Sequence, residues 1–141
     1  GVDASEAALG VAHRNMVALG VDDRATLQRG NWLDGITGEF DLVLCNPPYI
    51  AAAEMEGLGL ELSHEPEMAL TPGGDGLAPY RAIAPHLAPV LARGGRAMFE
   101  IGPTQAADVS AIFAAHGWGA PDIRRDFDGR DRCLIFSARP R

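Results

Sequence analysis

Lysine is absent from this sequence of 141 residues, and all twelve basic residues are arginine. Schiff-base chemistry and a phosphate-binding loop of the Walker type both need a lysine side chain, so both are excluded. Long apolar runs are missing too, because stretches such as Phe40–Cys45 fall far short of the roughly 20 residues of a membrane span. The sequence therefore predicts no lysine-based site and no transmembrane helix.

Cysteine and histidine are scarce. Cys45 and Cys133 each stand alone in an apolar run, which predicts buried free thiols in a reducing cytoplasm and no disulfide framework. The histidines show neither i,i+4 pairing nor a cysteine at ligand spacing, so we expect surface positions and no metal site. They are His13, His64, His86 and His116. The first residues lack the segments of a signal peptide, so we expect a cytoplasmic protein.

The remaining composition is that of an ordinary globular domain. Hydrophobic residues make up 47% of the chain, and the formal net charge is -7. A chain of this length buries enough apolar surface to fold without disulfides or a structural metal. We expect residues 1–141 to form a single domain. Because the first residue is not Met, we also expect the chain to begin inside a larger one.

Strand and helix patterns alternate along the chain. Strands are predicted at residues 2–3, 25–28, 40–45 and 97–101, the third of them buried and parallel to its neighbour. Helices are predicted from a capping box at Asp3–Glu6 to Leu19 with Gly20 as the stop, from 77 to 91 with three proline breaks and an end at Gly94-Gly95, and from 104 to 116. A hairpin of residues 123–127 and 132–137 closes the chain. This order predicts a doubly wound α/β sheet with an antiparallel edge.

Residues 51–76 form a long acidic insert, predicted to be a loop or partly helical. It has six acidic residues and no arginine, for a local charge of -6. They are Glu54, Glu56, Glu61, Glu65, Glu67 and Asp75. Loops of this length in a compact domain are usually functional or mobile.

Ligands of doubly wound sheets bind beyond the carboxyl ends of the strands, so the residues directly after each strand are the candidate site residues. They are Asp3, Asn31-Trp32, Asn46-Pro47-Pro48-Tyr49 and Glu100–Gly102.

Asn46-Pro47-Pro48-Tyr49 carries the most chemical information. Both Asn46 and Pro47 precede a proline, which favours extended backbone, and neither proline ring can donate a hydrogen bond. The carbonyls of Asn46 and Pro47 can therefore face outward as acceptors beside the Asn46 side-chain oxygen, an arrangement that suits a planar NH₂ group. Tyr49 adds an aromatic face for stacking. The alternative is a rigid turn after a core strand, with Asn46 as its cap.

These residues and several others resemble the HemK/PrmC family, the protein-(glutamine-N5) methyltransferases of peptide chain release factors. The segment between residues 65 and 80 separates this family from DNA adenine methyltransferases with the same core motif. The matching residues are Val2–Ser5, Ala12–Asn15, Gly30–Trp32, Phe40-Asp41 through Asn46–Ile50, Glu65-Pro66 with Ala69-Leu70, Gly74–Leu77 with Tyr80, Glu100–Gly102 with Gln105, and Gly129–Arg132.

The resemblance implies a Rossmann-like class I fold that uses S-adenosylmethionine. It implies that Asp3 binds the cofactor ribose and that Asn31 and Trp32 contact the adenine, although the family more often has Asp where Asn31 stands. Capping of a helix by Asp3 and core packing of Trp32 are the structural alternatives. The family's first strand and glycine-rich cofactor loop precede the position matched by Val2-Asp3, as does an N-terminal helical domain. The chain is therefore expected to be a truncated catalytic domain that binds cofactor weakly alone.

The resemblance further implies methylation of a glutamine side-chain amide in release factors. Asn46, Pro47, Pro48 and Tyr49 would bind the substrate and act in catalysis, and Asn46 would also contact the cofactor. The acidic insert disfavours DNA, whose phosphates need basic residues. The stretch from Asp122 has six arginines against four acids, but a solvated edge hairpin of mixed charge is the favoured explanation for them. Two alternatives stay open: a nucleic-acid amino methyltransferase, and a non-catalytic α/β domain in which the motif is only a turn.

Overall fold

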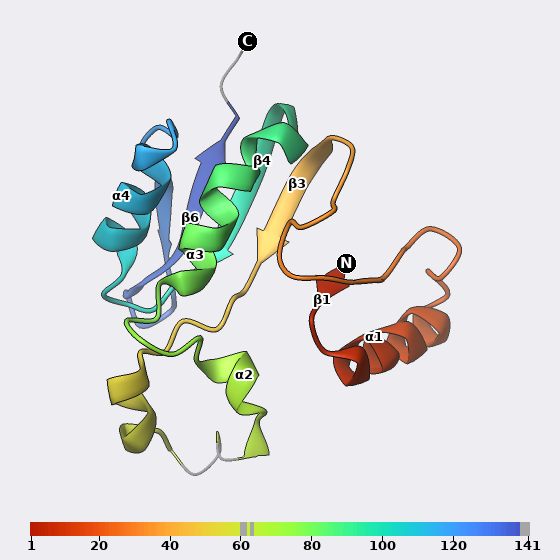
Figure 1. Cartoon of the computed structure of the whole chain (residues 1–141), viewed down its shortest axis with the longest axis horizontal. Coiled ribbons are helices and arrows are strands. Elements are labelled where there is room, and N and C mark those ends of the chain that lie inside the picture. Colours follow the sequence, from red (N-terminus) through yellow and green to blue (C-terminus); the bar gives the residue numbers. More distant parts are fainter. Residues whose placement is uncertain (60–61, 63, 139–141) are drawn as a thin grey trace. The chain divides into compact units, whose positions relative to one another are not determined.

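The computed structural model describes residues 1–59, 62 and 64–138. Contacts between residues divide the chain into two compact units, Gly1–Thr37 and Gly38–Arg141. Figure 1 shows the helices and strands of each unit.

The first unit contains strand β1 (Val2–Asp3), helix α1 (Glu6–Leu19) and strand β2 (Gln28–Arg29). The two strands pair in parallel, with Val2 opposite Gln28 and Asp3 opposite Arg29. Gly20 ends α1 in the left-handed region at φ 64° and donates its N–H to the last carbonyls, as predicted. The second strand begins later than the predicted residues 25–28.

The predicted capping box placed the helix cap at Asp3, and this is wrong. Ser5 is the N-cap, and its hydroxyl oxygen accepts a hydrogen bond from the N–H of Ala8 at 3.2 Å. Asp3 lies before the helix, where its Oδ1 accepts the N–H of Ser5 at 2.7 Å. Asp3 and Ser5 are both good capping residues, but the helix begins at Glu6 and only Ser5 directly precedes Glu6.

The second unit holds a four-stranded sheet in the order β3-β4-β6-β5. Strands β3 (Phe40–Cys45) and β4 (Leu91–Glu100) are parallel, whereas β6 (Asp131–Ser137) runs antiparallel to β4 and to β5 (Asp122–Arg125). The helical segments are η1 (Ala52–Gly57), α2 (Glu67–Leu70), α3 (Ala78–Ile83), η3 (Ala84–His86), η4 (Ala88–Val90) and α4 (Ala106–Ala115). The predicted α/β class, with parallel pairs and a C-terminal hairpin, is confirmed.

The core of the second unit lies between one face of the sheet and the helices α3 and α4. Phe99 of β4 and Phe136 of β6 are buried on that face, beside Phe113 of α4. Phe113 stacks on Phe136 with ring centroids 4.3 Å apart and lies 4.9 Å from the ring of Phe99. Tyr80 of α3 completes the cluster with an edge contact to Phe99. This cluster fixes the carboxyl end of β4 under the helices.

The expectation that Phe40–Cys45 is a buried strand is wrong, although its parallel pairing is confirmed. Val43 and Cys45 are half-buried, whereas Leu42 and Leu44 are 49% and 69% exposed. Successive side chains of a strand point to opposite faces, and β3 is the first strand of its sheet, with β4 as its hydrogen-bonded neighbour. Only one face of β3 therefore contributes to the core.

The predicted helix from 77 to 91 is also corrected. The structure has three short helical segments, α3, η3 and η4, each with a proline at its first or second position, where a missing N–H costs nothing. The chain becomes extended at Leu91, so Gly94-Gly95 lies inside β4. The pairing of β3 with β4 shifts register between Phe40 and Leu42. The two strands approach closely there, because a Cβ on Gly95 would lie 2.9 Å from the carbonyl oxygen of Phe40, and a glycine is therefore accommodated within β4.

The remaining predictions can be compared directly. The helix predicted for residues 104–116 is α4, and all four histidines are exposed, as expected. Cys45 and Cys133 are free but only half-buried. No helix in the described part of the chain has the length and apolar character needed to cross a membrane.

Truncation of the aromatic cluster is expected to destabilise the second unit strongly. Phe113→Ala removes a fully buried ring with three aromatic neighbours, so the free energy of unfolding should fall by about 3–5 kcal/mol. Phe127→Ala is the matched control, because Phe127 is fully exposed in the hairpin turn and its loss should change stability by less than about 0.5 kcal/mol. Urea unfolding of both variants measures the difference, and equal effects would contradict the assigned core.

Candidate functional site

In the first unit, the predicted residues Asp3, Asn31 and Trp32 lie together at the carboxyl ends of β1 and β2. Asp3 is the last residue of β1, and Asn31-Trp32 follows β2 after one glycine. A hydrogen bond of 3.1 Å from the N–H of Gly30 to the carbonyl of Asp3 joins the two strand ends. The parallel pairing therefore brings the three residues to one edge, as the sequence predicts.

These groups suit a nucleoside. One oxygen of the exposed Asp3 carboxylate accepts the N–H of Ser5, and among the described residues the other has no hydrogen-bond partner. Asn31 is exposed, and Trp32 is half-buried. Trp32 also has φ 56°, a left-handed conformation that costs a non-glycine residue of order 1–3 kcal/mol. Free acceptors beside an accessible indole fit a ribose and a planar base, and the half-exposure of Trp32 argues against a core role.

In the second unit, Asn46–Tyr49 follows β3 and Ile101-Gly102 follows β4. Cys45 pairs with Phe99 in the parallel ladder, so the two strand ends are direct neighbours. Pro47 is fully buried, whereas Asn46 is exposed. Among the described residues, neither the Asn46 side chain nor the Pro47 carbonyl takes part in a hydrogen bond. Both acceptors thus lack a partner, but only Asn46 is exposed, whereas the sequence predicts that the Pro47 carbonyl faces outward as well.

Tyr49 is held by its hydroxyl group. The hydroxyl donates to Oε1 of Glu100 at 3.0 Å and accepts from Nη1 of Arg132 at 3.3 Å. Burial raises the pKa of Tyr49, and the hydrogen bond to the Glu100 carboxylate raises it further, whereas Arg132 acts in the opposite direction. The phenol is therefore neutral at physiological pH and serves as a positioned aromatic group.

The backbone of Tyr49 is fixed separately. The side chain of Gln105 donates its Nε2–H to the Tyr49 carbonyl at 2.9 Å, and its Oε1 accepts the N–H of Gly102 at 2.9 Å. Gly76 passes so close that a Cβ there would lie 2.3 Å from the same carbonyl oxygen. The motif that follows β3 is thus clamped between the start of α4 and the glycine-rich turn before α3.

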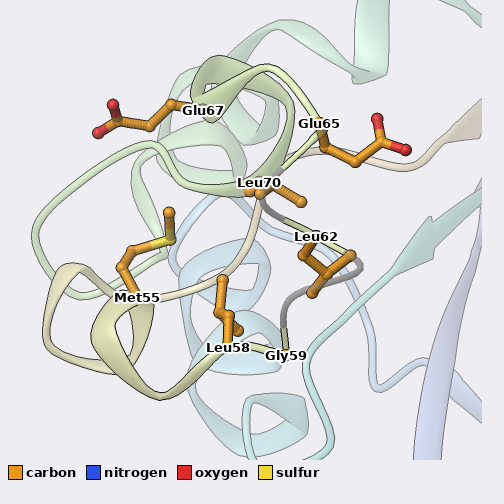
Figure 2. Close-up of a pocket in the computed structure, with 7 residues that line it drawn as sticks. All are labelled: Met55, Leu58, Gly59, Leu62, Glu65, Glu67 and Leu70. Carbon is orange, nitrogen blue, oxygen red and sulfur yellow. The ribbon is translucent and has the colours of Figure 1, made fainter.

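The acidic insert is joined to the motif through Ile50. The N–H of Ile50 donates to the carbonyl of Leu70 at 3.1 Å, and the hydroxyl of Thr71 donates to the carbonyl of Ile50 at 2.6 Å. The insert contains a hollow of about 260 Å³. Figure 2 shows its apolar lining side chains and the two glutamates beside them. Its lining residues are Met55, Leu58, Gly59, Leu62, Glu65, Glu67 and Leu70.

This hollow is smaller than the roughly 300–1,000 Å³ of typical small-molecule sites. The carboxylates of Glu65 and Glu67 point outward from it in Figure 2. The insert is partly helical, as predicted, through η1 and α2. Of its six acidic residues, Glu61 lies outside the described residues.

The thiol beside the motif is chemically quiet. Burial raises the pKa of Cys45 to about 12, so this group stays protonated at neutral pH. A protonated thiol is neither a nucleophile nor a metal ligand. The described residues also contain no group of three or more His, Cys, Asp or Glu side chains placed to hold a metal ion.

The model of the methyltransferase small domain family matches residues 1–78. The chain belongs to this methyltransferase family. The match includes the strand ends at Asp3, Asn31-Trp32 and Asn46–Tyr49, which lie in both units.

Curated relatives carry a more specific name. A release factor glutamine methyltransferase of Cereibacter sphaeroides is 46% identical over 97% of this chain and 49% of its own length. One of Agrobacterium fabrum is 44% identical over 96% of the chain and 47% of its own length. The chain thus spans about half the length of these relatives.

Solved structures show the fold. The ribosomal protein L11 methylase of Lactobacillus delbrueckii subsp. bulgaricus matches 98% of this chain and 56% of its own with a TM-score of 0.68, at 21% identity. The fold is therefore the Rossmann-like α/β fold of class I methyltransferases, as the sequence predicts.

The sequence did not predict that Glu100, Gln105 and Arg132 position the motif, although Glu100 was among the candidate site residues at the strand ends. All three stand in segments that match the HemK/PrmC pattern. Their partner Tyr49 is 51, 56 and 83 residues away in sequence. The available signal was the presence of polar side chains at the end of β4, at the start of α4 and at the start of β6.

Filling the close approach at Gly76 is expected to displace the motif. Gly76→Ala would place a methyl group against the Tyr49 carbonyl, and the free energy of unfolding should fall by about 1–3 kcal/mol beyond the cost of a positive φ. Gly73→Ala is the matched control, since Gly73 has φ 77° against 78° for Gly76 but open space around it. Thermal unfolding compares the two, and equal destabilisation would contradict the close contact.

The two thiols are expected to differ in reactivity. Burial raises the pKa of both, to about 12 for Cys45, so little thiolate is present at pH 8 and alkylation by iodoacetamide should be slow. The increase in pKa is larger for Cys45, so Cys133 should react faster. Mass spectrometry of the time course identifies the labelled cysteine, and faster labelling of Cys45 would contradict its burial.

Proposed function

We propose that the protein transfers a methyl group from S-adenosylmethionine to the side-chain amide nitrogen of a glutamine in peptide chain release factors. The observation that carries this proposal is the pair of free acceptors, the Asn46 side chain and the Pro47 carbonyl, at the end of β3. The names of relatives 44–46% identical over almost the whole chain support the choice of substrate.

The donor-binding role falls to Asp3, Asn31 and Trp32. S-adenosylmethionine, when bound, supplies a methyl group on a positively charged sulfur. The free oxygen of Asp3 would accept hydrogen bonds from the ribose hydroxyls, Asn31 would bind a polar edge of the adenine, and Trp32 would cover its ring. We propose that Asn46 of the second unit also contacts the donor.

The acceptor role falls to Asn46–Tyr49. An amide nitrogen is a poor nucleophile, because its lone pair is delocalised into the carbonyl group. If the Asn46 oxygen and the Pro47 carbonyl each accept one N–H, they orient this nitrogen and offset the positive charge that develops on it. In such a transfer, the amide nitrogen would form a bond to the methyl carbon as the bond from that carbon to the sulfur breaks, and one amide proton would pass to water. No strong base is required.

Tyr49 and Pro48 would complete the acceptor pocket. The positioned ring of Tyr49 offers a face for the planar amide, and Pro48 keeps the backbone extended. The acidic insert beside Ile50 favours a protein over a nucleic acid as the partner, since phosphates are repelled by carboxylates. Because release factors act in translation, we propose that the protein acts in the cytoplasm. We also propose that residues 1–141 belong to a single catalytic domain.

The first test is methyl transfer by the full-length natural protein. Labelled S-adenosylmethionine is offered with a release factor, with the same factor carrying Ala in place of its acceptor glutamine, and with DNA. Label on the unmodified factor alone is the expected result. Label on DNA would replace the proposal with a nucleic-acid amino methyltransferase, and no label on any of them would favour a non-catalytic domain.

The second test addresses the acceptor residues. Asn46→Ala should lower turnover by about 10²-fold or more, because an oriented acceptor is lost in the transition state. Asn15→Ala changes the same residue type on the exposed surface of α1 and should leave turnover unaltered. Initial rates of both variants decide the matter, and retained activity in Asn46→Ala would remove this residue from the mechanism.

A further inference from the structure

The C-terminal hairpin reaches the motif through one arginine. Arg132 lies in β6, and its Nη1 donates to the Tyr49 hydroxyl at 3.3 Å and to the carbonyl of Ile101 at 3.1 Å. Ile101 directly follows β4, so both contacts lie at the strand ends that carry the motif. The Arg132 side chain is 28% exposed and is thus partly shielded from water.

The hairpin turn holds this arginine in place. Nε and Nη2 of Arg132 donate to Oδ2 of Asp126 at 3.3 and 3.1 Å. The other oxygen of Asp126 accepts the backbone N–H groups of Asp128 and Arg130 at 3.0 and 2.9 Å. The carboxylate is therefore anchored by the turn on one side and directs the guanidinium on the other.

Glu100 opposes Arg132 at the same hydroxyl. Its carboxylate accepts a hydrogen bond from the Tyr49 hydroxyl. The hydroxyl hydrogen therefore points toward Glu100, and an oxygen lone pair points toward Arg132. Two groups of opposite charge thereby fix both the ring and its hydroxyl rotor. The carbonyl of Glu100 in turn accepts the hydroxyl of the buried Tyr80 at 2.7 Å, which ties this residue to the core.

We propose that Arg132, held by Asp126, is a positioning residue that fixes the Tyr49 ring for binding of the acceptor amide. The inference rests on the proposed function and names a further residue for it. Arg132 acts through the Tyr49 hydroxyl, so its loss weakens acceptor binding and leaves donor binding intact. The C-terminal hairpin is then part of the acceptor site.

The hairpin supplies a matched control for the test. Arg125 pairs with Asp131 at 3.1 Å in the same hairpin, but its side chain is 71% exposed and Asp131 does not belong to the motif. Arg132→Gln and Arg125→Gln each remove one cation and one ion pair. In the full-length natural protein, Arg132→Gln should lower kcat/KM for the release factor about tenfold, the effect of one lost charge-assisted hydrogen bond, while the KM for S-adenosylmethionine stays constant. Arg125→Gln should alter neither value.

A double-mutant cycle tests the route through the hydroxyl. Tyr49→Phe removes the atom that Arg132 contacts, so adding Arg132→Gln to it should cost nothing more. Equal kcat/KM values for Tyr49→Phe and the double variant support the proposal. Effects that multiply, or an Arg132→Gln variant as active as Arg125→Gln, overturn it.

A titration of Tyr49 gives a readout that does not depend on activity. The phenol is followed by tyrosinate absorbance, with Tyr49→Phe as the reference that isolates its signal. Arg132 lowers the pKa of Tyr49 and Glu100 raises it, so Arg132→Gln should shift this pKa upward and Glu100→Gln should shift it downward. Glu100→Gln keeps an acceptor oxygen and serves where Arg132→Gln does not fold.

The readouts separate the two proposals. A wild-type protein that labels no release factor contradicts the proposed function, and the titration alone then decides the role of Arg132. Opposite shifts in the two variants support the network around the hydroxyl, and an unchanged Tyr49 pKa in both overturns it.

Discussion

Two consecutive prolines after β3 impose the constraint on which the candidate site depends. Pro47 and Pro48 cannot donate backbone hydrogen bonds, so the ladder between β3 and β4 cannot continue through them. The same property leaves the Pro47 carbonyl free to accept a hydrogen bond from a ligand. A segment without ladder bonds must be fixed by other contacts, and the second unit provides them from four distant parts of the chain.

Those contacts hold the motif at Tyr49 and leave the exposed Asn46 side chain and the Pro47 carbonyl without hydrogen-bond partners among the described residues. Gln105 binds the Tyr49 carbonyl, and Gly76 leaves just enough room for that carbonyl to pass. Glu100 and Arg132 hold the hydroxyl at the far end of the side chain. Rigidity is therefore supplied next to the free acceptors and not at them, which suits a site that must exchange one ligand for another.

The sequence predicted the positions at the strand ends because that prediction needs only local patterns. Short strands, the stop at Gly20 and the hairpin turn are all visible in neighbouring residues, and the rule for parallel sheets then locates Asp3, Asn31 and Asn46. The start of β4 was missed because Gly94-Gly95 normally marks a break, whereas the close approach of Gly95 to the carbonyl oxygens of Phe40 and Ala92 explains a glycine within this strand. The cap at Ser5 was missed for a related reason, since two residues of equal capping ability stood two positions apart.

The network around Tyr49 could not be predicted in this way, because its contacts join residues that only the folded sheet brings together. The family pattern contained Glu100, Gln105 and Arg132, yet a pattern does not say which side chain contacts which. In the proposal, residues suited to a nucleoside stand at the ends of β1 and β2, and acceptors suited to an amide stand at the end of β3, with Asn46 serving in both roles. Each set depends on its own parallel strand pair, because parallel pairing is what places successive carboxyl ends at one edge. Both substrates of the proposed reaction are thus bound by residues at the carboxyl ends of parallel strands.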